Sequence, residues 1–319
     1  MNKLIYKINQ LNKSVSYDEI RKEIFGTELA KEMYKNKYHF GQLKLFMSEL
    51  LFLSKYAKHE NILVLYVGAA NGYHTWYMAK HMFPNFKFHL FDRTKFHDIF
   101  YEQKLDNVKI ISDYFSEKYA NKYSQNTDNI LFMCDMRNLD IKLFKDKTLK
   151  NKDEYIKKPL SEDQEQIISK DMNDQLAWAE IMKPLACYLK FRLPYDGTNF
   201  DYLKGKIYLQ PYSPNGNECR ILITQYEKKI EYNSSDIDGK IAYFNWVMRV
   251  QEIHTKWDDI CDKYKIKNKW DNVYSLYIVQ YYLKKFGRLY TKKNTANLFL
   301  DIVKFHQEAN DEKYSKIFI

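Results

Sequence analysis

The feature that most limits how this chain can fold is an apolar run that ends in a glycine turn at residues 65–74. The run reads LYVGAANGYH, with Gly68 directly after the apolar residues and Gly72 four positions later. Glycine lets the backbone turn tightly and approach a ligand without a Cβ atom in the way. A strand that passes through such a turn into a helix is typical of a Rossmann-like domain, where the turn opens a ligand site.

Similar apolar runs alternate with helical patterns through the middle of the chain. Four of them are short and apolar throughout, as strands covered on both faces are. The pattern predicts strands at 61–68, 87–92, 108–112, 129–135, 187–194, 206–212 and 218–226, and helices near 41–57, 73–83, 116–123 and 162–182. Strands that alternate with helices favour a largely parallel sheet. We therefore expect an α/β, Rossmann-like fold with a mostly parallel central sheet flanked by helices.

Helical additions are expected at both ends of this core. The 319 residues are predicted to form one domain, with a charged N-terminal arm at 1–40, an α/β core at 41–233 and C-terminal helices at 234–319. The last part is predicted to be helical at 239–263, 272–285 and 291–309. A charged stretch at 138–158 has few apolar residues, and we interpret it as a surface insertion, with contact to RNA as the alternative.

Composition limits the class of protein further. The net charge of +10 favours polyanionic partners such as nucleic acid, although an AT-rich genome would produce the same excess of lysine. No apolar run approaches the ~20 residues of a membrane span, and the N-terminus is too polar for a signal peptide. The four cysteines are scattered without a CxxC pair, so we expect buried thiols, no disulfide and no structural metal. The expected class is a soluble intracellular protein.

The spacing of the glycine turn indicates the kind of cofactor. G-x-x-x-G differs from the G-x-G-x-x-G that lies against a dinucleotide pyrophosphate, and it suits a ligand without phosphates, such as S-adenosylmethionine. Asp92 ends the next predicted strand, where its carboxylate can accept hydrogen bonds from both ribose hydroxyls. Asp135 ends the fourth strand, where a sulfonium would stabilise its charge. The alternative is a structural turn with ordinary aspartates at the strand ends.

Two lysines and two carboxylates complete the candidate site. Their order is the one used by 2′-O-ribose methyltransferases: Lys44, Asp135, Lys190 and Glu218. Lys44 falls off the apolar face of its predicted helix, and Lys190 stands mid-strand, where an ammonium needs a partner or a cleft. A lysine can take a hydroxyl proton where nearby cations or burial disfavour its charged form. We expect Lys190 to be the base or to contact the hydroxyl directly, and the other three to tune and position it. Each one alone would be interpreted as a surface charge or an ion-pair partner.

Six stretches together resemble one known family. In order they are GQLKL (41–45), the glycine turn, CDMR (134–137), LKFRLPY (189–195), LQPYSP (209–214) and ECRIL (218–222). In order and spacing they resemble the poxvirus cap-specific mRNA 2′-O-methyltransferases, a family that also serves as the small regulatory subunit of viral poly(A) polymerases. The resemblance implies the methyltransferase form of the Rossmann-like fold, with S-adenosylmethionine as the cofactor.

The resemblance also implies a role for each matching residue. It makes the lysines and carboxylates named above the catalytic set. It implies cofactor contacts from Gln42, Tyr66, Gly68, Gly72, Asp92, Arg93, Phe115 and Asp135. It implies cap and RNA contacts from Phe25, Arg192, Leu193, Pro194, Tyr195, Asp196, Asn217 and Asp238. Aromatic rings suit a methylated guanine because the base is a delocalised cation, and carboxylates suit its N–H groups.

Three hypotheses for the function remain open on these grounds. The first is methylation of the 2′-OH of the first transcribed nucleotide of capped mRNA. The second is an RNA-binding processivity subunit of a poly(A) polymerase with little or no methyl transfer, and one molecule can combine both. The third, a nicotinamide-dependent Rossmann enzyme, is disfavoured because the phosphate turn lacks its second glycine. The resemblance implies the host cytoplasm as location and capped mRNA as partner, and it leaves virion packaging and a polymerase catalytic subunit open.

Overall fold

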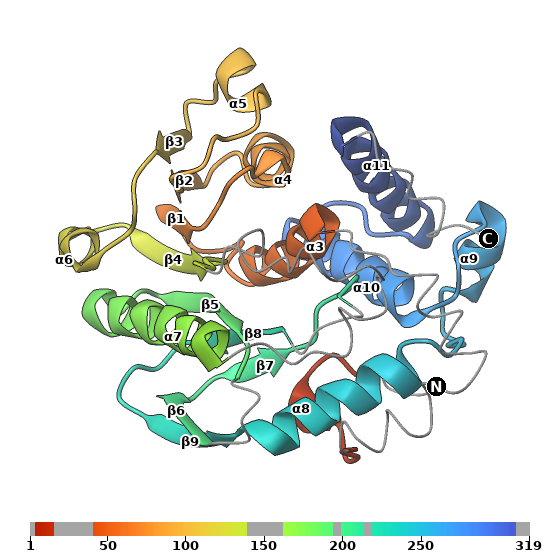
Figure 1. Cartoon of the computed structure of the whole chain (residues 1–319). Coiled ribbons are helices and arrows are strands. Elements are labelled where there is room, and N and C mark those ends of the chain that lie inside the picture. The colour runs from red at the N-terminus through yellow and green to blue at the C-terminus, as the bar shows by residue number, and fades with distance from the viewer. Residues whose placement is uncertain (1–3, 16–40, 139–161, 194–198, 214–217, 311–319) are drawn as a thin grey trace, which may run out of the picture.

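A computed structural model describes residues 4–15, 41–138, 162–193, 199–213 and 218–310 of the chain (Figure 1). A seven-stranded sheet in the order β3-β2-β1-β4-β5-β8-β7 forms the centre of the molecule. Neighbours among the strands β1 to β5 are parallel, and β8 is antiparallel to both β5 and β7. The strands are β1 Ile62–Val67, β2 Lys87–Phe91, β3 Val108–Ile111, β4 Asn129–Cys134, β5 Ala186–Phe191, β7 Lys206–Tyr208 and β8 Cys219–Ile223. The predicted α/β, Rossmann-like fold is confirmed.

Helices cover both faces of this sheet (Figure 1). On one side lie α6 Glu117–Ser124 and α7 Glu162–Met182, which pack against each other. On the other side lie α3 Gly41–Ser54, α10 Trp270–Lys285 and α11 Lys292–Asn310, together with α4 Tyr73–Tyr77 and its π-helical continuation η2 Met78–Met82. The remaining short helices are η1 Ile8–Gln10, α5 Ile99–Glu102, α8 Ser234–Tyr243, η4 Phe244–Met248 and α9 Asp258–Tyr264.

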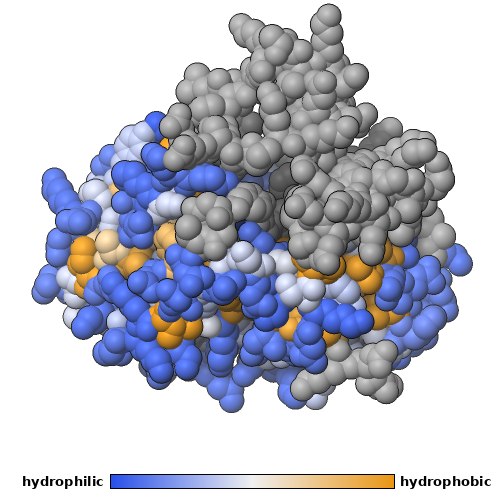
Figure 2. All heavy atoms as spheres, turned by 60° about the horizontal axis from the view of Figure 1, so that its bottom comes forward, coloured by the Kyte–Doolittle hydropathy of each residue, from blue (hydrophilic) through white to orange (hydrophobic). Residues whose placement is uncertain are grey.

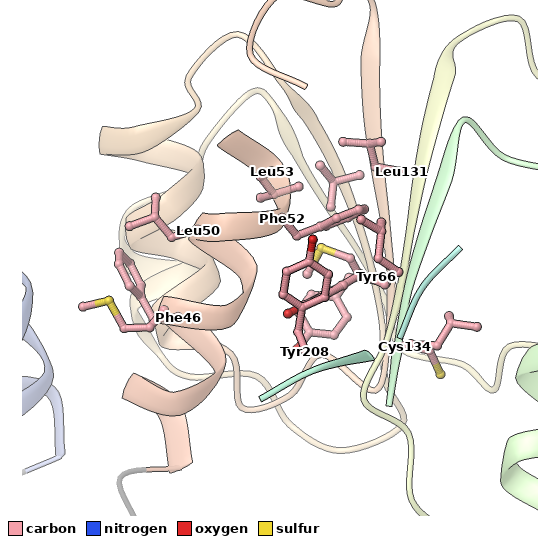
Figure 3. Packing of buried hydrophobic residues seen from close by; sticks show 14 of the residues in the cluster. Phe46, Leu50, Phe52, Leu53, Tyr66, Leu131, Cys134 and Tyr208 are labelled. Carbon is pink, nitrogen blue, oxygen red and sulfur yellow. The ribbon is translucent and has the colours of Figure 1, made fainter. Parts of the chain in front are cut away.

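Helix α3 is buried almost all round rather than along a single stripe (Figure 3). The Phe52 ring stacks on Tyr188 of β5 at a centroid distance of 4.9 Å, whereas Phe46 meets the His306 ring of α11 at 5.2 Å. A helix that is apolar on every side belongs in the interior. The polar residues of α3 must therefore find partners inside the protein, and this applies directly to Lys44.

The predicted helix at 239–263 is wrong in its middle. The chain leaves the helical path after η4 and returns to it only at α9. In between, the Thr255 N–H donates to Asp258 Oδ1 at 2.8 Å and the Trp257 N–H donates to Thr255 Oγ1 at 3.1 Å. These side chains satisfy backbone donors locally, which is how Ser, Thr and Asp compete with helix formation.

A second, two-stranded sheet was absent from the sequence prediction. Strands β6 Asn199–Leu203 and β9 Lys229–Asn233 pair antiparallel to each other. Both strands mix polar and charged residues with buried aromatic ones such as Tyr202 and Tyr232, so they lack the continuous apolar runs that mark the central strands.

Figure 2 shows the distribution of hydropathy over one face of the molecule. Hydrophilic residues cover most of the described part of the face in Figure 2, and hydrophobic residues form small separate groups on it. Among the helices of the described ranges, none combines the length and the apolar character required to cross a bilayer. The four cysteines are buried, as expected.

Candidate active site

Strand pairing brings the predicted catalytic residues together at one edge of the sheet. Cys134 at the end of β4 lies opposite Leu189 of β5, so the next residue along, Asp135, comes beside Lys190. Lys190 in turn lies opposite Arg220 of β8. In open α/β sheets this edge, beyond the carboxyl ends of the parallel strands, is where ligands bind.

The four predicted residues form one connected chain of ion pairs. The Nζ atom of Lys190 lies 3.1 Å from Asp135 Oδ1 and 3.1 Å from Glu218 Oε2. The other oxygen of Glu218, Oε1, lies 2.9 Å from the Nζ atom of Lys44. The exposed fractions of the four side chains lie between 9% and 19%, so the cluster is sheltered but still reached by solvent.

Arg220 belongs to the same cluster and was missed in the sequence analysis. Its guanidinium donates to Asp135 Oδ1 at 2.5 Å and to the Cys134 carbonyl at 3.0 Å, and it lies 3.7 Å from Glu218 Oε1. A usable signal was present, because residues two apart in a strand point to the same face. Arg220 stands two positions after Glu218 and therefore shares its side of β8.

The cations decide the ionisation of the carboxylates. Burial acts to raise the pKa of Asp135, but Lys190 and Arg220 outweigh it and lower this pKa to about 2. Burial also acts to raise the pKa of Glu218, and Lys190, Lys44 and Arg220 together bring it well below its usual range. Both carboxylates are therefore ionised at neutral pH, and each has a cation besides Lys190.

Two glutamines support this cluster from behind. Gln210 donates from Nε2 to Glu218 Oε1 at 3.2 Å and accepts from Arg220 Nε at 3.0 Å. Gln175 of α7 donates to the main-chain carbonyl of Lys190 at 2.7 Å. These bonds fix the carboxylates and the strand that carries Lys190, which is what a preorganised site requires.

The glycine turn lies directly against this cluster. Gly68 has a φ of +78°, and a Cβ atom on it would lie 2.6 Å from the main-chain N of Met136, the residue after Asp135. Gly72 has a φ of +65°, and its Cβ would lie 2.2 Å from the Ala69 carbonyl oxygen. Both positions therefore require glycine, as the sequence indicated.

Asp92 ties the end of β2 to the glycine turn. Its Oδ2 accepts from the Ala70 N–H at 3.0 Å, and its Oδ1 accepts from the N–H and the hydroxyl of Thr94 at 2.9 and 2.8 Å. The carboxylate thus stands beside the turn with both oxygens already hydrogen-bonded to the protein, and its contact with a ribose stays a prediction.

A buried polar network joins two of the predicted cofactor residues. The Nδ1 atom of His74 lies 2.6 Å from Gln42 Oε1, and its Nε2 lies 3.0 Å from Glu49 Oε2. Tyr66 donates its hydroxyl to the other oxygen, Glu49 Oε1, at 2.5 Å, and burial raises the pKa of Tyr66 well above its usual range. Glu49 and His74 were not singled out from the sequence. Glu49 lies in the stretch SELLFLSK (48–55), which follows GQLKL, and His74 is the last residue of the glycine turn.

Two further predicted cofactor residues follow the strands β2 and β3, respectively. The Arg93 guanidinium is exposed, 4.8 Å from the centroid of the Tyr114 ring, and donates to the Tyr114 hydroxyl. Phe115 is 6% exposed and packs edge-on against Phe91 and Trp178, both at 5.0 Å. Phe115 is thus mainly a core residue, and its contact with a cofactor stays a prediction.

The predicted cap and RNA residues are only partly within the described chain. Arg192 makes a bidentate ion pair with Glu165 of α7 at 2.8 and 2.7 Å, and Leu193 is buried. Asp238 lies on α8, close enough to Cys219 for its charge to act on that thiol. Phe25, Pro194, Tyr195, Asp196 and Asn217 lie outside the described residues.

Comparison with known proteins agrees with this geometry. The model of the poly(A) polymerase regulatory subunit family matches residues 1–307. A cap-specific mRNA (nucleoside-2′-O-)-methyltransferase of myxoma virus (strain Lausanne) is 28% identical over 251 residues, which cover 73% of this chain and 69% of the viral protein. A protein of the same name from fowlpox virus (strain NVSL) is 27% identical over 259 residues, or 71% of this chain and 75% of the relative. The chain belongs to the poly(A) polymerase regulatory subunit family.

Proposed function

We propose that this protein transfers a methyl group from S-adenosylmethionine to the 2′-OH of the first transcribed nucleotide of mRNA with a 7-methylguanosine cap. The observation that carries the proposal is the continuous ion-pair chain of Lys44, Glu218, Lys190 and Asp135 beside a glycine turn. The named activity of the myxoma and fowlpox relatives supports it.

The residues around the turn fit the proposed cofactor. The absence of a Cβ atom on Gly68 lets the turn pack closely against the backbone after Asp135, so that the turn and the ionised Asp135 carboxylate lie side by side. Asp92, Gln42 and Tyr66 are the further residues that would hold it. When bound, S-adenosylmethionine supplies an electrophilic methyl group on a positively charged sulfur, which the Asp135 carboxylate would stabilise.

Lys190 is the residue that contacts the ribose hydroxyl and takes its proton. The Lys190 amine must be uncharged to accept a proton, although it touches two carboxylates. Each carboxylate also has a second cation: Glu218 has Lys44, and Asp135 has Arg220. Both therefore stay charge-compensated when Lys190 is neutral, and the fixed geometry orients Lys190 toward the hydroxyl.

The direct test is methyl transfer with labelled S-adenosylmethionine. Short RNAs with a 7-methylguanosine cap, an unmethylated cap or no cap are incubated with the protein and with Lys190→Ala. Label on the first 2′-O, only with the methylated cap and lost by more than ~100-fold in Lys190→Ala, is expected. Lys229→Ala is the matched control, because Lys229 pairs with Glu180 on the surface. Equal transfer by Lys190→Ala and the parent would remove Lys190 from the mechanism.

A second function is favoured by the family itself. The matched family is described as a poly(A) polymerase regulatory subunit, so we also propose that the chain supports tail extension by a catalytic subunit. Tail lengths made by that subunit with and without this protein test the role. If the parent and Lys190→Ala lengthen the tails equally, the role in tail extension does not depend on methyl transfer.

A further inference from the structure

A cluster of four lysines and two tyrosines lies apart from the candidate active site. It consists of Lys7, Lys55, Lys206, Lys285, Tyr208 and Tyr281, and we call it the lysine–tyrosine cluster. Its members come from the N-terminal stretch, the residues after α3, strand β7 and helix α10. Four segments far apart in the sequence therefore place positive charge at one location.

Tyrosine rings separate the ammonium groups of the cluster. The Nζ atom of Lys55 lies 5.4 Å from the ring centroid of Tyr208 and 5.5 Å from that of Tyr281. Lys7 lies 5.5 Å from Tyr208 on one side, and Lys285 lies 5.3 Å from Tyr281 on the other. These cation–π contacts hold three ammonium groups in fixed positions around two rings.

The cluster has no counter-charge within the described ranges. None of its four lysines forms an ion pair with a carboxylate of residues that the structure describes. Lysines elsewhere on the surface do so: Lys87 pairs with Asp128, and Lys229 pairs with Glu180. Burial, with the charges of Lys7, Lys206 and Lys285, lowers the pKa of Lys55 to about 8. An anion bound here would relieve this repulsion.

The cluster and the catalytic residues lie at opposite ends of α3. Lys44 is in the first turn of that helix, and Lys55 follows its last residue, Ser54. At 1.5 Å per residue the two lysines are about 16 Å apart along the helix axis. A ligand of the cluster is therefore bound separately from the methyl-transfer site.

We propose that the lysine–tyrosine cluster binds the phosphate backbone of single-stranded RNA. Lysine ammonium groups act as point charges for phosphates, and the partly exposed Tyr281 ring offers a surface for a base without sequence preference. Tyr208 is buried, and its ring serves to position Lys7 and Lys55. The net charge of +10 favours association with a polyanion. RNA fits better than an acidic protein surface, because the ammonium groups of Lys55 and Lys285 lie 5.5 and 5.3 Å from the centroid of the partly exposed Tyr281 ring, so that a base and its neighbouring phosphates can be held together. The inference goes beyond the proposed methyl transfer and does not require it.

Binding of a short uncapped RNA without S-adenosylmethionine tests the inference apart from the proposed catalysis. Fluorescence anisotropy over a range of salt concentrations compares the parent with the double variant Lys7→Gln/Lys285→Gln. The expected result is weaker binding, with a slope of log affinity against log salt that is smaller by roughly 1–2. The matched control, Lys118→Gln/Lys122→Gln, removes two exposed lysines of α6 and should leave the slope unchanged.

The single variant Lys206→Gln keeps the test decisive if the double variant folds poorly. Lys206 is exposed, so its loss leaves the packing intact and should lower the slope by roughly 0.7. The proposal would be overturned if the variants Lys7→Gln/Lys285→Gln and Lys206→Gln had the same salt slope as the control variant Lys118→Gln/Lys122→Gln. Unchanged RNA binding together with lost binding of an acidic polypeptide, poly-glutamate, would also overturn it and assign the cluster to a protein partner.

Discussion

Lys190 on β5 and Arg220 on β8 lie directly opposite each other, and both contact the same atom, Oδ1 of Asp135. The guanidinium of arginine does not lose its proton in proteins, whereas an amine can. Asp135 therefore has a permanent cation in Arg220 besides Lys190. The proposed role of Lys190 as a base requires such a second cation, because the carboxylate then stays compensated when the amine is uncharged.

Arg220→Gln is expected to lower methyl transfer by roughly 100-fold or more. Without the guanidinium, the Asp135 carboxylate has no contacting cation besides Lys190 in the part of the chain that the structure describes. Arg220→Lys keeps a positive charge at this position and should therefore restore part of the rate that Arg220→Gln loses. The measurement is the transfer rate of both variants under the same conditions. Equal rates for the two variants would mean that the positive charge of Arg220 does not contribute.

Gly68→Ala is expected to destabilise the fold by more than ~2 kcal/mol and to weaken cofactor binding. The new Cβ atom would clash with the backbone of Met136, the residue after Asp135, and alanine is also strained at the positive φ of this position. Gly287→Ala is the matched control. Gly287 also has a positive φ, +63°, but no atom lies within 4 Å of its Cβ position. Its replacement should therefore lower the free energy of unfolding only by the cost of the strained backbone, about 1 kcal/mol. Denaturant unfolding and calorimetric titration with S-adenosylmethionine measure the two effects. Equal losses in both variants would contradict the close contact.

His74→Ala is expected to weaken binding of S-adenosylmethionine by roughly tenfold or more, since a hydrogen bond to a charged group contributes about 1.5–3 kcal/mol. His74 orients Gln42, and its loss leaves one oxygen of the buried Glu49 without this partner. Tyr66→Phe removes the bond to the other oxygen and leaves His74 in place. Titration calorimetry of both variants, with a KM-against-kcat comparison, separates binding from chemistry. A loss confined to kcat would contradict the positioning role.

Acid should destabilise the protein below pH 6.5 through His306. Burial lowers the pKa of this residue to about 3, so the folded state stays neutral while the unfolded chain takes up a proton. The stability from this group is fully present above pH 6.5 and falls by up to about 1.4 kcal/mol per pH unit toward pH 3. The pKa of Asp135 is lowered from 3.8 to about 2, so this carboxylate also makes the folded state less stable as the pH falls, but only below about pH 4.

Urea unfolding at several pH values measures this effect, with His306→Gln as the comparison. The variant has no titrating ring, so its stability should change less between pH 7 and pH 5. The same slope in both proteins would falsify the assignment to His306.

The central fold, and the meeting of Lys44, Asp135, Lys190 and Glu218 in one cluster, could be predicted because both follow from local patterns. Short, mainly apolar runs predicted the strands β1 to β5. Asp135 and the glycine turn could be placed because they directly follow the strands β4 and β1. What the sequence did not reveal depends on contacts between distant segments. Arg220 looks like an ordinary strand residue until the register of β5 and β8 places it at Asp135. Glu49 and His74 meet only when α3 packs against the turn.

The errors at the C-terminal end have a similar origin. Residues 249–257 are compatible with a helix, but Thr255 and Asp258 satisfy the backbone in another conformation. Strands β6 and β9 are short and bury only a few side chains, among them Tyr202 and Tyr232, so they lack the continuous apolar runs from which the central strands were predicted. The aromatic cap positions Phe25 and Tyr195 remain predictions, since they lie outside the described residues.

The burial of α3 on nearly every side has a mechanical consequence. Packed between the sheet and the helices α10 and α11, this helix behaves as a stiff rod with Lys44 at one end and Lys55 just beyond the other. Because its neighbours hold it on nearly every side, the helix keeps the spacing between Lys44 and Lys55 constant. An RNA strand bound at the Lys55 end would thus be held at a fixed distance from the proposed methyl-transfer site.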